Sequence, residues 1–115
     1  MREAALEADY QLGAEPVLLT VTIGNGQFGT SLVRLNSAEK CRGDIGDLEL
    51  GKPGSLKGKK VRVKSVVTDV RDETNRLTVT YKLAGGAQDQ TFVSTGVVEN
   101  DGDSMLFRAI FNLKG

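Results

Sequence analysis

Two groups of carboxylates are the residues whose types and spacing could do chemistry in this chain. Each group lies in a turn-like segment between apolar runs. Carboxylate oxygens are the ligands that calcium prefers, and loops can supply the roughly six to eight oxygens that it takes. The candidate metal ligands are Asp69, Asp72, Glu73, Glu99, Asp101 and Asp103.

A structural explanation competes with this calcium hypothesis. Asp, Asn and Gly are the residues that tight turns need in any case, and neither segment matches the EF-hand pattern. If the strands after residue 60 run up and down, however, both turns lie at the same end of the molecule. The two groups could then converge, as in a calcium-dependent C2-like or carbohydrate-binding-like domain.

Catalysis has little support in the sequence. The chain has no His, which excludes a His-based triad, a His general base and a His metal ligand. Cys41 is the single cysteine, so no internal disulfide or multi-cysteine zinc site can form. Its neighbours Lys40 and Arg42 could favour the thiolate form of Cys41, but no other base stands beside it. The pair Asp44 and Asp47 has no setting that favours acid–base work. We therefore expect a non-enzyme, with a small enzyme using Cys41 or paired acids as an alternative.

The segment Gly24-Asn25-Gly26-Gln27-Phe28-Gly29 matches the dinucleotide-binding pattern G-x-G-x-x-G. That site needs a helix next, whereas the residues after Gly29 favour a strand. Asn25-Gly26 is instead typical of a β-hairpin turn. The sequence therefore predicts that strand 17–23 pairs with strand 27–36.

Five basic residues form a row between residues 57 and 64. Alternation places three of its members on one face of a strand, where they could meet a phosphate backbone or another anionic surface. Aromatic residues for base stacking are scarce, so nucleic acid is not expected. The preferred interpretation is an edge strand that lysines protect from pairing. The row comprises Lys57, Lys59, Lys60, Arg62 and Lys64.

The elements that must position these residues are almost all strands. Period-two alternation or β-branched runs bounded by turn residues predict them at 17–23, 27–36, 47–50, 60–70, 76–83, 89–98 and 103–113. The alternation slips at Val66-Val67, which predicts a bulge or burial on both faces. Residues 1–14 contain good helix formers and predict an arm or a short helix.

Together these segments predict one all-β domain over residues 15–115. Six to eight short strands in 115 residues favour a single antiparallel β-sandwich of immunoglobulin-like or C2-like architecture. The formal net charge is zero, and the sequence shows no signal peptide and no membrane span. We therefore expect a soluble cytoplasmic protein.

The resulting functional expectation is a non-catalytic module for protein binding or assembly. The chain itself is one candidate partner, because an unpaired edge strand can template another strand. Strand 103–113 is the candidate edge, since Met105 to Phe111 includes one charge, Arg108. If that strand is central instead, Phe107 belongs to the core.

Overall fold

The computed structural model describes residues 2–24, 27–70 and 75–115, and its regular structure is almost entirely β. Its elements are β1 (Arg2–Gln11), β2 (Val17–Ile23), β3 (Phe28–Leu35), β4 (Ala38–Gly43), β5 (Ile45–Gly51), α1 (Pro53–Leu56), β6 (Lys60–Thr68), β7 (Arg76–Ala84), β8 (Gln90–Val97) and β9 (Ser104–Lys114). The predicted all-β class is confirmed. Each predicted strand is present, whereas β1 and β4 were not predicted.

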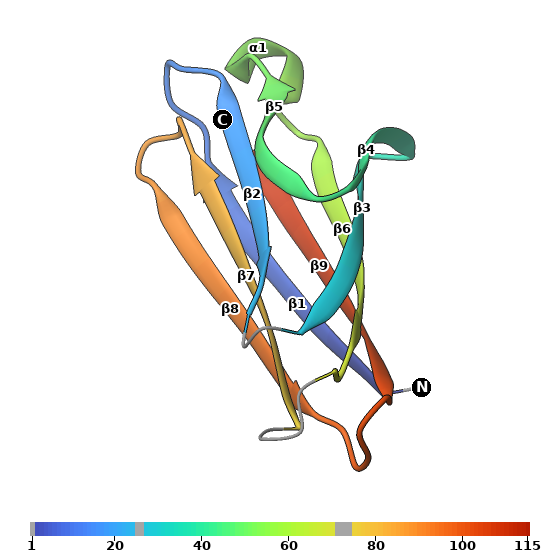
Figure 1. Cartoon of the computed structure of the whole chain (residues 1–115). Helices are drawn as coiled ribbons and strands as arrows, with labels where there is room; N and C mark the ends of the chain where they lie inside the picture. Colours follow the sequence, from blue (N-terminus) through green and yellow to red (C-terminus); the bar gives the residue numbers. More distant parts are fainter. Residues whose placement is uncertain (1, 25–26, 71–74) are drawn as a thin grey trace.

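The strands form two sheets that pack face to face as a sandwich (Figure 1). The five-stranded sheet has the order β1-β9-β6-β3-β4, and the four-stranded sheet has the order β5-β2-β7-β8. All neighbours run antiparallel except β1 and β9, which pair in parallel from Arg2 opposite Met105 to Gln11 opposite Lys114. The larger sheet is therefore mixed.

The predicted hairpin between strands 17–23 and 27–36 is wrong. Strand β2 pairs with β5 and β7 in one sheet, whereas β3 pairs with β4 and β6 in the other. The chain crosses between sheets here, a tertiary choice that a local turn signal does not encode. Asn25 and Gly26 themselves lie outside the described residues. Because 28–35 is a strand, the helix that a dinucleotide site requires is absent as well.

The expectation of an N-terminal helix is also wrong. Residues 2–11 form β1, and the single helical turn of the described chain is α1, which begins at Pro53. Alternate residues of β1 turn inward, ending at Tyr10, so pairing with β9 and burial outweigh the helix preference of Ala and Glu. No helix in the described part of the chain is long and apolar enough to span a membrane.

Strand β6 contains no bulge at the point where its sequence pattern slips. Its register with β9 is continuous from Lys60 to Thr68, and its inner face continues through Ser65. Ser65 is fully buried opposite Ser31, and their hydroxyl oxygens lie 2.7 Å apart. A hydrogen-bonded serine pair thus occupies a core position where the sequence pattern would place an apolar side chain.

Strand β9 is central, so its expected role as an exposed edge is wrong. It lies between β1 and β6. Its inner face is buried against the other sheet through Met105, Phe107, Ala109, Phe111 and Leu113. The position of Phe107 confirms the alternative expectation that this residue belongs to the core.

Two tyrosines are buried in contrasting ways. The Tyr10 hydroxyl accepts a hydrogen bond from the Gly86 amide at 2.8 Å, and its ring lies where a Cβ at Gly86 would be. The Tyr81 hydroxyl is buried with no hydrogen-bond partner among the described residues. Its ring packs edge-on against Phe111, with 5.6 Å between ring centroids. Burial raises the pKa of Tyr81 well above its usual value.

These surroundings predict opposite effects for the same change at the two positions. Tyr81→Phe removes an unpaired buried hydroxyl and should raise the free energy of unfolding by about 1 kcal/mol. Tyr10→Phe leaves the Gly86 amide unpaired and should lower it by about 1 kcal/mol. Urea unfolding at pH 7 measures both. A loss of stability in Tyr81→Phe would show that a buried water pairs with that hydroxyl.

The raised pKa of Tyr81 adds a pH dependence to this prediction. Unfolded Tyr81 ionises near pH 10, whereas folded Tyr81 stays neutral at that pH. Tyr81 therefore contributes a loss of stability as pH rises above about 10. Tyr81→Phe should lose less stability than the wild type over that range.

Candidate functional site

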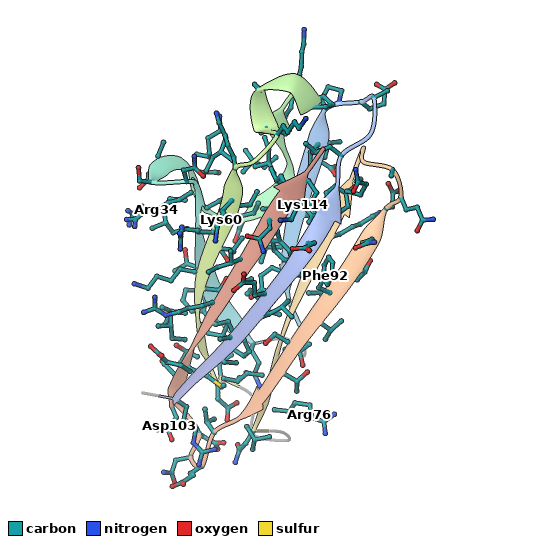
Figure 2. All side chains as sticks on the ribbon, turned by 180° about the vertical axis from the view of Figure 1, so that it is seen from behind. Arg34, Lys60, Arg76, Phe92, Asp103 and Lys114 are labelled. Carbon is teal, nitrogen blue, oxygen red and sulfur yellow. The ribbon has the colours of Figure 1, made fainter. Side chains whose placement is uncertain are left out.

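The described residues of the two predicted acidic groups lie at the same end of the sandwich, next to each other. The Asp69 amide donates to the Asp103 carbonyl at 2.9 Å, and the Gly102 amide donates to the Asp69 carbonyl at 2.8 Å. Asp69 is almost fully buried, whereas Glu99 and Asp101 are exposed. Figure 2 shows Asp103 and Arg76 at this same end of the molecule. Asp72 and Glu73 lie outside the described residues.

Hydrogen bonds within the turns engage most of the described carboxylates. The Asn75 amide nitrogen, when turned toward the acids, donates to Asp69 at 2.7 Å and to Asp101 at 3.1 Å. The Asn100 backbone amide donates to Asp103 Oδ2 at 3.1 Å. Among residues 2–24, 27–70 and 75–115, no three acidic or cysteine side chains are grouped so that they could hold a metal ion. Calcium binding by all six residues stays a prediction.

The residues considered for catalysis lie on β4, on β5 and in the link between these two strands. Cys41 belongs to β4, opposite Val33, and is half-buried against the core. Asp47 is in β5 with a φ of 44°, and its amide donates to the Thr20 hydroxyl at 3.0 Å. Asp44 borders a shallow hollow beside β2. This arrangement gives Cys41 and Asp47 structural neighbours, Val33 and Thr20.

The basic row does not protect an edge, so that interpretation is wrong. Strand β6 lies between β9 and β3, and its Lys60, Arg62 and Lys64 project from the outer face of the five-stranded sheet. Lys57 and Lys59 lie in the segment between α1 and β6. The members of the row on β6 therefore belong to the outer face of the five-stranded sheet.

The sandwich has four edge strands, β1, β4, β5 and β8. Charged side chains guard the first three, and β5 also has register shifts against β2. Strand β8, with the sequence QTFVSTGV, has no charge and no proline. Two of its side chains, Val93 and Val97, are among the large apolar residues that the structure exposes, at 58% and 51%. The least protected edge of the described chain is therefore β8.

The backbone of β8 presents alternate residues to this open edge. The Val98 amide donates to the Asn75 carbonyl at 3.0 Å, in line with the β7–β8 register. In an antiparallel pair, hydrogen-bonding direction alternates along the strand. The amides and carbonyls of Thr91, Val93 and Thr95 therefore face away from β7. Val97 faces the same way, and Arg2 Nη1 donates to its carbonyl at 3.0 Å.

Sequence reasoning missed this edge because it searched for apolar runs. Residues 89–98 were predicted as a strand, but which strands lie at an edge depends on pairings between distant segments. The residues of β8 carry no signal that marks it as an edge, because natural edge strands are commonly guarded by charges and an uncharged strand is more typical of the middle of a sheet.

The neighbours of Cys41 predict that its thiol has no functional role. Cys41→Ser should leave binding and assembly unchanged and should lower stability by about 1 kcal/mol, because a hydroxyl replaces a half-buried thiol next to the core. Thermal unfolding and sedimentation check the two parts. Selective alkylation of Cys41 at neutral pH that abolishes a function would contradict the prediction.

No protein-family model matches the chain, and neither the curated proteins nor the solved structures give a match.

Proposed function

We propose that this domain is a non-catalytic assembly module in which β8 pairs antiparallel with β8 of a second copy. The observation that carries the proposal is the edge of β8, whose own residues are uncharged and whose amides and carbonyls at Thr91, Val93 and Thr95 are turned outward. Arg2 engages this edge further along, at the Val97 carbonyl. Such an edge is a template for another strand. Strand addition satisfies these groups with main-chain hydrogen bonds.

The sequence of β8 suits a two-fold axis that passes through Val93. Residues directly opposite each other in an antiparallel pair point to the same face, so Val93 would meet Val93 of the partner subunit. Thr91 would then meet Thr95 of the partner subunit, and Thr95 would meet Thr91 of the partner subunit. Three outward-facing residues on each copy allow about six hydrogen bonds between the copies. This register leaves the bond between Arg2 and Val97 intact.

Side chains and net charge support the same occupant. The central contact buries the exposed side chain of Val93 on both copies, and cross-strand pairs of Thr stabilise a sheet. The chain has zero formal net charge, so two copies are not repelled by their overall charge. Pairing through β8 would join two four-stranded sheets into one continuous sheet.

We also propose an immunoglobulin-like architecture and a cytoplasmic location for the domain. The packing of two sheets of short strands supports an immunoglobulin-like sandwich. The single cysteine supports a cytoplasmic location, where disulfides are rare.

Val93→Lys tests the assembly. It places two lysines directly opposite each other at the two-fold axis. The dissociation constant of the dimer should therefore be at least about tenfold higher than that of the wild type. Sedimentation velocity over a range of concentrations measures the dissociation constant. Circular dichroism should show an unchanged fold, since Val93 projects into solvent.

Thr22→Lys is the matched control, because Thr22 is exposed on the same sheet face but lies on the central strand β2. Its dimer should dissociate as the wild type does. A wild type that stays monomeric at high concentration would contradict the proposal, as would equal weakening by both lysines.

A further inference from the structure

The outer face of the five-stranded sheet carries a basic patch that the assembly proposal does not use. Three neighbouring strands contribute to this patch in register, and Figure 2 shows Arg34 and Lys60 on the same side of the molecule. We define the basic patch as Arg34 on β3, Lys60, Arg62 and Lys64 on β6, and Arg108 on β9.

Within the basic patch, like charges stand directly opposite each other. Arg34 pairs with Arg62 in the β3–β6 register, and Lys64 pairs with Arg108 in the β6–β9 register. Opposite residues of neighbouring strands have Cα atoms about 4.5–5.5 Å apart, and like charges in such pairs are destabilising. The free domain therefore holds four cations in pairs that work against its own stability.

The acidic residues of the same face neutralise this charge only in part. Glu3 forms an exposed ion pair with Arg108 at 3.6 Å. Glu39 stands opposite Arg34 in the β3–β4 register, but its ion pair is with Arg42, at 3.0 Å. Glu7 and Asp9 instead accept hydrogen bonds from the Asn112 side chain, at 3.0 and 3.1 Å. Among the described residues, Arg34, Lys60, Arg62 and Lys64 have no ion pair.

The patch also has a hollow with an apolar floor. A depression of about 210 Å³ is bordered by Arg34, Arg62, Lys64 and Arg108, with the half-buried side chains of Leu32 and Ile110 between them. A ligand here would contact cations and apolar groups together.

We propose that the basic patch binds an acidic peptide segment in extended conformation. Lys60, Arg62 and Lys64 are alternate residues of one strand, so their side chains repeat about every 7 Å. An extended peptide with an acidic residue at every second position repeats its carboxylates at the same spacing, and arginine forks bind carboxylates in bidentate geometry.

The composition of the patch favours a peptide over nucleic acid. Sequence-tolerant binding of single strands depends on aromatic side chains on which bases stack, and the patch contains none. An acidic peptide needs no such stacking.

A labelled peptide of alternating glutamate and threonine, eight residues long, tests the proposal by fluorescence anisotropy at low salt. The double variant Arg34→Gln/Arg62→Gln should bind this peptide at least about fivefold more weakly than the wild type, because it loses two charge-assisted contacts. Its melting temperature should equal or exceed that of the wild type, since the repulsion between opposite arginines is gone. Weaker binding together with undiminished stability is the signature of a binding site.

Lys52→Gln/Lys82→Gln provides the matched control, because it removes two exposed positive charges outside the patch. This variant should bind as the wild type does, and the same peptide with glutamine in place of glutamate should not bind. All arms can be repeated in the Val93→Lys background, so the result does not depend on assembly through β8.

Two outcomes overturn the proposal. One is equal affinity in the wild type and in the double variant. The other is an oligonucleotide of matched charge that binds more tightly than the peptide and loses that affinity in Arg34→Gln/Arg62→Gln, which would assign the patch to nucleic acid.

Discussion

The burial of one face of β9 is the constraint on which the rest of this sandwich depends. Phe107 and Phe111 are fully buried, and Phe111 contacts both Tyr81 and Phe92 from the opposite sheet. Strand β9 lies inside its sheet, with a neighbour on each side, so adjacent strands help to cover this face. Strand β6 supplies one neighbour and β1 supplies the other, which places β1 at an edge and gives the larger sheet its one parallel pair.

The sequence predicts those elements whose inner face is uniformly apolar. In β7, Leu77, Val79, Tyr81 and Leu83 alternate with polar residues, and all four are fully buried. Strand β1 gives no such signal, because small residues such as Ala4 and Ala8 occupy inner positions that β9 and the opposite sheet cover. Its conformation is set by pairing with a segment at the far end of the chain. Local propensity does not include this pairing and therefore favours a helix.

Edge and centre are likewise not local properties. From their sequences, β6 and β9 are both candidate edge strands, β6 because of its basic residues and β9 because of its nearly uncharged apolar run. Both strands nevertheless lie inside the sheet. The lysines of β6 face solvent from the middle of the sheet, where they border arginines of neighbouring strands that the sequence alone does not bring together. The acidic turns differ, since alternating strand directions suffice to place Asp69 and Asp103 at one end.

The parallel pairing of β1 with β9 also bears on how the molecule folds. It joins residues that are separated by nearly the whole chain, and β9 is the last of these strands to be synthesised. The larger sheet therefore lacks a central strand until synthesis reaches residue 114, and until then β1 has no partner in it. Such distant contacts slow folding and prolong the exposure of unpaired strands. During translation, this chain should depend on chaperones more than a sandwich built from consecutive hairpins would.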